Sequence, residues 1–230
     1  MTTVAIHQPN YLPWLGYFAK MAAADIFVLL DDVQFSKGSY TNRVQMARAG
    51  APVWLTVPVT HKFGAQIREV GIASPDWTRG HVETLKQAYR KAARFSEVWP
   101  ELERWLAQAS GSLADINSGL IRQFAARLGL SARLTMSSEL PIAVDAAADQ
   151  RLALIVAYLA PGGTYLSGAG GAKYQTEPMF AAHGLKLAYS TFKLAPYACS
   201  GDTFLPGLSV VDALFHLGWE ETAAIVHRAT

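Results

Sequence analysis

The chain lacks several features that would place it in a specialised class of protein. Cys199 is the only cysteine among 230 residues, which excludes an internal disulfide framework and a cysteine-rich zinc site. No apolar run reaches the ~20 residues that a membrane-spanning helix needs. The first residues, MTTVAIHQPN, have neither a basic n-region nor a long apolar stretch. We therefore expect no secretory signal, no membrane partner and a cytoplasmic protein.

Charge is also sparse. The 20 basic and 18 acidic residues give a formal net charge of +2, and the basic residues are scattered, which argues against a nucleic-acid partner. The histidines form no HExxH or similar spacing, so we predict no metal site and no cofactor. Hydrophobic residues make up 51% of the chain, enough for a full core. No repeat or long linker divides it, and we expect a single α/β domain over residues 1–230.

The order of the patterns predicts a Rossmann-like, mostly parallel sheet flanked by helices. Apolar runs typical of buried parallel strands and helical periodicities alternate along the chain, with a small antiparallel hairpin and a helical insertion between them. We expect strands at 2–7, 26–30, 67–72, 132–136, 164–167 and 185–190, a hairpin of 41–48 with 52–59, and helices at 15–23, 77–95, 99–109, 113–128, 146–159, 177–183 and 209–228, the last broken at Gly218.

The loop after the first strand is the strongest candidate for an active site. In open parallel sheets, ligands bind at the carboxyl ends of the strands, and His7 stands where the first strand should end. Hydrogen-bonding and aromatic residues follow it, with a glycine at a helix start that would let a ligand approach backbone N–H groups. The residues predicted to act here are His7 and Lys20 in catalysis and Gln8, Asn10, Tyr11, Trp14, Gly16 and Tyr17 in substrate binding.

A second polar segment, DDVQFSKGSYTNR, follows the second strand at the same edge of the sheet. Asp31 and Asp32 could orient a histidine, bind a cation or act as acid and base. Basic and amide side chains after them could clamp an anion. The alternative is a solvated loop with a capping aspartate. The predicted binding residues here are Lys37, Tyr40, Asn42 and Arg43.

A third candidate is the loop SGAGGAKY, which joins a predicted strand to a helix. Such glycine-rich turns bring backbone amides close to an anion, but this one is neither a Walker A loop nor a GxGxxG fingerprint. An ordinary flexible turn remains the alternative. The predicted binding residues are Ser167, Gly168, Gly171 and Tyr174. Cys199 has no sequence context of a nucleophile.

The run HQPNYLPWLGYFAKMAAADIFVLLDDVQFSKGSYTNR resembles the N-terminal signature of the WbqC-like protein family. The similarity continues through WLTVPV, QRLALIVAYL, TYLSGAGGAKY and FLPGLSVVDALFHLG. The resemblance implies a bacterial, cytoplasmic enzyme or accessory protein of glycan or small-molecule assembly, because the family is associated with O-antigen and other sugar-modification gene clusters. The motif positions are His7, Pro9, Gly16, Lys20, Asp25, Asp31, Asp32, Asn42 and Arg43. The family pattern more often has glutamine at the position of Cys199.

A looser resemblance is to nucleotidyltransferases, whose HxGH region also lies at the start of the first helix. Tyr17 stands where their second histidine would fall, so the likeness supports a Rossmann-like fold more than nucleotidyl transfer.

Three functions follow as hypotheses. The leading one is a transferase that moves an acyl or aminoacyl group to an amine or amino sugar, with His7 as base and Asp31 or Asp32 orienting it. The second is a nucleotidyltransferase-like enzyme, and the third a non-catalytic protein that binds a sugar intermediate. The partners would be a small-molecule donor and acceptor, nucleotide-linked or carrier-linked, and exposed aromatic residues leave a homodimer open.

Overall fold

The computed structural model describes residues 1–143, 148–173, 175–197 and 204–228. Five strands form one parallel sheet in the order β7-β2-β1-β8-β9. Their bounds are β1 (Thr3–His7), β2 (Ile26–Leu29), β7 (Arg133–Met136), β8 (Thr164–Ser167) and β9 (Lys186–Tyr189). The predicted parallel, Rossmann-like sheet is confirmed.

The strand order reverses direction beside β1. From β1 the chain moves outward to β2 and β7, and it then returns to build β8 and β9 on the other side. His7 pairs with Leu29 of β2, and Thr3 pairs with Thr164 of β8, so all three strands end at the same edge. The carboxyl ends of β1 and β8 therefore form a topological switch point, where such sheets bind ligands.

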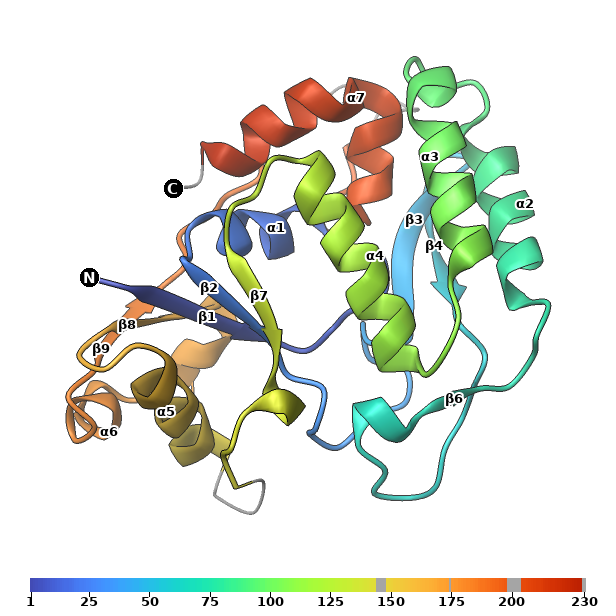
Figure 1. Ribbon diagram of the computed structural model, residues 1–230. Coiled ribbons are helices and arrows are strands. Elements are labelled where there is room, and N and C mark those ends of the chain that lie inside the picture. The colour runs from blue at the N-terminus through green and yellow to red at the C-terminus, as the bar shows by residue number, and fades with distance from the viewer. Residues whose placement is uncertain (144–147, 174, 198–203, 229–230) are drawn as a thin grey trace.

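Helices cover both faces of the sheet (Figure 1). Val4 and Ile6 of β1 pack on one face with α5 and α6, while Ala5, which lies between them, belongs to the larger core on the other face with α1, α4 and α7. The alternation follows from the strand period of two. The helix bounds are α1 (Leu15–Ala22), α4 (Leu113–Arg127), α5 (Ala148–Leu159), α6 (Glu177–Ala181) and α7 (Val210–His227). The predicted break in the last helix is confirmed, because Gly218 has a φ of 82°.

The predicted hairpin is also present. β3 (Arg43–Arg48) and β4 (Ala51–Thr56) pair antiparallel, with Arg43 opposite Thr56 and Gln45 opposite Trp54. Ala49 and Gly50 form the two-residue turn with φ values of 50° and 75°, the positive range that a tight hairpin turn of this length requires.

The helical insertion differs from the prediction at one boundary. α2 (Trp77–Tyr89) ends early and α3 (Phe95–Gln108) begins a turn before the predicted start at Trp99. The reason is tertiary: Arg94 N donates to Phe215 O at 2.9 Å, and the ring of Phe95 stacks on Trp99 with centroids 5.1 Å apart. These contacts fix where the chain turns, and Pro100 then lies inside the helix.

The strand predicted at 67–72 is wrong over its first half. Residues 67–69 form a short 3₁₀ helix, η1 (Ile67–Glu69), because the Glu69 carboxylate accepts from Gln66 N at 2.8 Å and caps it. Only β6 (Gly71–Ile72) is extended, and it pairs antiparallel with β5 (Val59–Thr60). The other 3₁₀ turns are η2 (Ser137–Glu139) and η3 (Ala169–Lys173). Among the described helices, none is long and apolar enough to cross a bilayer.

Candidate functional site

His7 ends β1 at the switch point and is part-buried between two aromatic side chains. Its ring centroid lies 4.8 Å from that of Tyr17 and 5.6 Å from that of Trp14. The Nδ1 atom lies 3.1 Å from Gln8 O. Enclosure by these groups, together with the positive charge of Lys20, lowers the pKa of His7 to about 3. The imidazole is therefore neutral at physiological pH.

The neutral ring has one defined tautomer. A carbonyl oxygen can only accept a hydrogen bond, so Nδ1 must donate its proton to Gln8 O. The lone pair is then on Nε2. Tyr17 supports the same carbonyl, because its hydroxyl donates to Gln8 O at 3.2 Å. The site thus presents a ring nitrogen that can accept a proton.

The loop that follows His7 is held by side chains from two distant parts of the chain. Asn117 of α4 donates through Nδ2 to Pro9 O at 2.8 Å and to Thr41 O at 2.7 Å. Ser209 Oγ donates to Leu12 O at 2.8 Å, at the residue where φ is +40°. An unusual backbone conformation held by buried side chains is typical of a pre-organised site.

Lys20 is a buried cation beside His7. Its side chain is 4% exposed, and Nζ donates to Ile6 O at 2.8 Å. Burial lowers the pKa of Lys20 to about 8. Among the described residues, no carboxylate lies within ion-pair distance of Nζ. A buried charge without a counter-charge is costly, so this one favours an anionic ligand.

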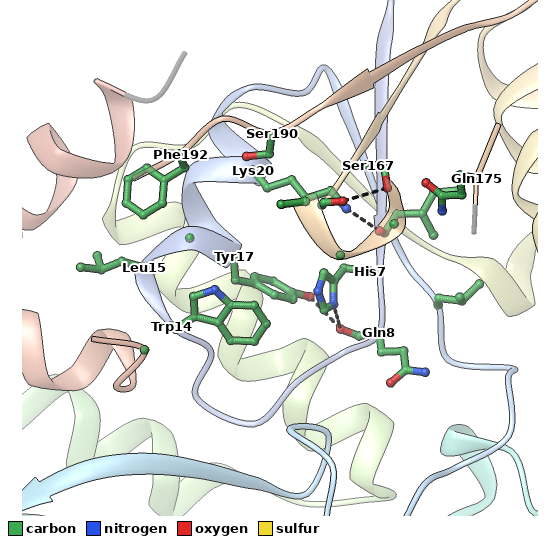
Figure 2. A pocket seen from close by; sticks show the side chains of 18 of the residues that line it. His7, Gln8, Trp14, Leu15, Tyr17, Lys20, Ser167, Gln175, Ser190 and Phe192 are labelled. Carbon is green, nitrogen blue, oxygen red and sulfur yellow. Dashed lines mark hydrogen bonds between the residues drawn. The ribbon is translucent and has the colours of Figure 1, made fainter. Parts of the chain in front are cut away.

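His7 and Lys20 face one cavity of about 630 Å³, shown in Figure 2. A cavity of this size fits a small-molecule ligand. Its walls come from the ends of β1, β8 and β9, the start of α1, and the chain near 192–194 and 207–208. The lining residues include Ile6, His7, Gln8, Trp14, Leu15, Gly16, Tyr17, Lys20, Leu152, Tyr165, Ser167, Gly168, Gly171, Gln175, Ser190, Phe192 and Leu194.

Two glycines give the cavity its shape. A Cβ at Gly16 would lie 3.0 Å from Trp14 Nε1 and 3.2 Å from Phe192 Cδ1. A Cβ at Gly171 would collide with Ser167 Oγ and lie 2.5 Å from Gln175 Oε1. A side chain at either position would force these lining groups to move. Packing within the protein therefore accounts for the two glycines, and no bound ligand is needed to explain them.

The structure brings together many of the predicted site residues. The cavity is lined by His7, Lys20, Gln8, Trp14, Gly16, Tyr17, Ser167, Gly168 and Gly171. Tyr174 and Cys199 lie outside the described residues. No group of three or more potential metal ligands gathers in the described part of the chain.

Asp31 and Asp32 are placed elsewhere, although they follow the neighbouring strand. Asp31 accepts from Ser138 N at 3.0 Å and from Ser138 Oγ at 2.7 Å. Asp32 forms a buried ion pair with Arg151 of α5 at 2.5 Å, and Ser137 Oγ lies within hydrogen-bond distance of both carboxylates. These contacts join the ends of β2 and β7 to α5. The prediction that an aspartate orients His7 does not match this geometry, because Nδ1 pairs with Gln8 O instead.

Asn10, Tyr11 and Asn42, which were predicted to bind substrate, are buried in structural contacts. Tyr11 is fully buried, and its hydroxyl pairs with His81 Nδ1 at 2.8 Å. Asn10 lies 3.5 Å from Thr41 Oγ1, and Asn42 accepts from Gly38 N at 3.1 Å. None of the three lines the cavity.

The other predicted binding residues of this segment lie toward the surface. Lys37 and Tyr40 are exposed. The guanidinium of Arg43 lies 4.1 Å from the ring centroid of Trp54. Lys37, Tyr40 and Arg43 are not among the residues that line the cavity.

The cavity lining also includes residues outside the predicted site, among them Gln175, Ser190, Phe192 and Leu194. Ser190 directly follows β9, so the rule that ligands bind at carboxyl ends of parallel strands would have found it. Phe192 and Leu194 lie on an irregular segment, and nothing local in the sequence places that segment over the cavity.

Comparison with known proteins gives the family. The model of the WbqC-like protein family matches residues 8–224. A protein of Mycobacterium tuberculosis, named Uncharacterized protein Rv1507c, is 32% identical over 224 residues, which cover 96% of each chain. The family-model match begins at Gln8, directly after His7, and includes the cavity-lining segments that follow. The chain belongs to the WbqC-like protein family.

Proposed function

We propose that this protein is a transferase of small-molecule or glycan biosynthesis, which moves an acyl or aminoacyl group from an activated, anionic donor to an amine or amino sugar. The observation that carries the proposal is the pairing of a neutral base, His7, with an uncompensated cation, Lys20, in one cavity. The cavity lies at the switch point of a parallel sheet, the usual place for a ligand in this architecture.

His7 would act on the acceptor. As the amine nitrogen bonds to the carbonyl carbon of the donor, its N–H proton passes to the Nε2 lone pair. The bond from that carbon to the leaving group then breaks, and the electron pair goes with the leaving group. Because the pKa of His7 is lowered, the imidazolium readily releases this proton, which passes to the departing group. The products are an amide and the protonated leaving group.

Lys20 would act on the donor. Its ammonium group has three hydrogens, and one is directed at Ile6 O. The others can bind an anionic group such as a phosphate or carboxylate. Ser167 and the backbone of Gly168 line the same cavity and offer further donors. An anion here would supply the counter-charge that Lys20 lacks.

The strand order favours a second candidate. Nucleotides bind at the switch point in many doubly wound sheets, so a nucleotidyltransferase-like enzyme uses the same cavity differently. That function predicts consumption of a nucleoside triphosphate with release of pyrophosphate. A third possibility, a binding protein for a sugar intermediate, predicts a stable complex without turnover.

The experiment tests the proposed roles of His7 and Lys20 separately. Thermal-shift screening of acyl-coenzyme A thioesters, aminoacyl adenylates, nucleotide-sugars and nucleoside triphosphates is carried out on wild type, His7→Gln and Lys20→Met. We expect an anionic donor to stabilise wild type and His7→Gln, and to lose its effect on Lys20→Met. With an amine acceptor, turnover in His7→Gln should fall by about 10²- to 10⁴-fold, the usual contribution of a general base.

Matched controls are His61→Gln and Lys186→Met, since both side chains are exposed and lie outside the cavity. Neither should change donor binding or turnover. Turnover in His7→Gln within a few fold of wild type would refute the role of His7. A donor shift that survives in Lys20→Met would refute the anion site.

A further inference from the structure

A row of aromatic side chains leads out of the cavity across the surface. Trp14 lines the cavity, and its ring centroid lies 5.3 Å from that of Tyr40. Tyr40 in turn lies 5.6 Å from Trp54, on which the guanidinium of Arg43 rests. We call Trp14, Tyr40 and Trp54 the aromatic track. Tyr40 and Trp54 take no part in the proposed transfer chemistry.

The track is exposed but held in place. Tyr40 is 39% and Trp54 is 42% exposed, unusual for rings of this size. Arg43 and Trp54 lie on one face of the hairpin, because Arg43 pairs with Thr56 and Trp54 is the diagonal neighbour two residues away. Tyr40 is fixed by its backbone, since its carbonyl accepts from Tyr11 N at 3.0 Å. Fixed, solvent-facing aromatic rings form a surface that loses little conformational entropy on binding.

The track is continuous with the proposed transfer site. One wall of the cavity is the Trp14 ring, which contacts His7 with centroids 5.6 Å apart. The same ring also contacts Tyr40, with centroids 5.3 Å apart. A substrate longer than the cavity, with its reacting amine beside His7, would leave the cavity past Trp14 and lie along Tyr40 and Trp54.

The angles between the aromatic planes indicate which kind of ligand ring can bind to the track. The Trp14 and Tyr40 planes are inclined by 56°, and those of Tyr40 and Trp54 by 58°. Neighbouring rings therefore do not form the parallel slot that sandwiches a planar base. A pyranose ring needs only one aromatic face for its C–H groups and keeps its hydroxyls in water. The Tyr40 hydroxyl and the Arg43 guanidinium can bind such hydroxyls.

We propose that the aromatic track binds a saccharide ring of the acceptor, outside the cavity in which transfer takes place. As an acceptor subsite it rests on the proposed function, but saccharide binding to the track is measurable without any turnover.

The experiment is saturation-transfer NMR and calorimetric titration with cellotriose, maltotriose and chitotriose, and with adenosine and uridine as comparison ligands. The proteins are wild type, Trp54→Ala and Tyr40→Ala. Phe63→Ala and Tyr158→Ala are the matched controls, because these aromatic side chains are 101% and 55% exposed and are not part of the track. Two track variants are used because Trp54 also supports the hairpin, whereas Tyr40 lies in a loop.

We expect at least one trisaccharide to bind wild type, and each track variant to weaken it by about 3- to 10-fold, the effect of losing one aromatic contact. The controls should bind as wild type does. Three results would overturn the proposal: no saccharide binding up to about 10 mM, a weak limit for specific ligands; nucleoside binding that depends on Trp54; or a dimer, seen by sedimentation, that Trp54→Ala dissociates.

His7→Gln and Lys20→Met separate this proposal from the preceding one. Both variants should keep saccharide binding, because neither residue belongs to the track. Saccharide binding without any donor turnover would leave the track intact and remove the transferase. Donor turnover without saccharide binding would support the transferase and refute the saccharide site.

Discussion

Two buried polar clusters lie at the carboxyl ends of adjacent strands, and they differ in how their charges are balanced. At the end of β1, Lys20 is 4% exposed and faces a cavity beside a neutral His7. At the end of β2, Asp32 is also 4% exposed, but it pairs directly with Arg151. Asp31 beside it is held by Ser138 through a backbone and a hydroxyl hydrogen bond.

The difference shows how similar residues at one sheet edge take different tasks. A buried charge that already has its partners ties elements together, here β2, β7 and α5. A buried charge that lacks them destabilises the free protein and gains most from an incoming ligand. By this criterion we infer that the Asp31 and Asp32 cluster at the end of β2 is structural, and we propose that the His7 and Lys20 cluster at the end of β1 binds a ligand. The following variants test that contrast.

The largest effect on stability is expected when only one member of the buried Asp32–Arg151 ion pair is removed. Arg151→Met leaves the Asp32 carboxylate buried without its cation, and we expect the free energy of unfolding to fall by about 3–5 kcal/mol. Urea unfolding measures it. The double variant Arg151→Met with Asp32→Leu should recover most of the loss, because no charge remains unpaired. Glu101→Gln, which breaks the more exposed pair with Arg127, should cost about 1 kcal/mol or less. An equal loss in both single variants would contradict a special role for burial.

Removing the unpaired charge of Lys20 should instead raise the free energy of unfolding. Burial lowers the pKa of Lys20 from 10.5 to about 8, so its charged form costs folding energy at pH 7. Lys20→Met removes that cost and loses one hydrogen bond to Ile6 O. We expect a net stabilisation of about 1–3 kcal/mol in urea unfolding, together with loss of donor binding. Destabilisation by Lys20→Met would mean that the charge already has a partner. Lys186→Met, which changes an exposed lysine, should leave stability unchanged.

Donor affinity should depend on pH through the same residue. In the free protein Lys20 loses its proton as pH rises through about 8, while His7, with a pKa of about 3, stays neutral over that range. The association constant of the donor that gives the largest thermal shift should therefore fall by up to about tenfold per pH unit above pH 8. Calorimetric titration between pH 6 and pH 10 measures it. Lys20→Arg should remove the fall, since a guanidinium stays charged; a fall that persists in this variant must come from another group.

The smallest effect on stability is expected when one of the two hydrogen bonds from Ser138 to Asp31 is removed. Ser138→Ala removes the 2.7 Å hydroxyl contact to Asp31 but keeps the backbone donor Ser138 N. The expected loss is about 1–2 kcal/mol in urea unfolding, with donor affinity as in wild type. A large loss of donor affinity in Ser138→Ala would place the β2 cluster in the binding site after all.

Much of this arrangement could be predicted from local patterns. The short apolar runs at 2–7, 26–30 and 164–167 fix strands of a parallel sheet, and the carboxyl-end rule then selects His7 and the Ser167 loop as neighbours. Both line the cavity. The same rule placed Asp31 and Asp32 too close to His7, because it gives the sheet edge but not the partners that each side chain finds there.

Those partners are distant in the sequence. The two aspartates are held by residues more than 100 positions later in the chain: Ser137, Ser138 and Arg151. No local sequence pattern predicts these contacts. The start of α3 at Phe95 is a similar case, since it depends on Phe215 across the fold.

Hydrophobic periodicity and the positions of glycine and proline are local properties of the chain. They were enough to predict the alternation of strands and helices, the parallel sheet and the site at the end of the first strand. Which buried charges are paired depends on contacts between residues that are distant in the sequence. The tertiary structure placed Arg151 against Asp32 and left Lys20 facing an open cavity. The free energy of a buried charge depends on its surroundings within a few ångströms, and only the folded chain brings those surroundings together.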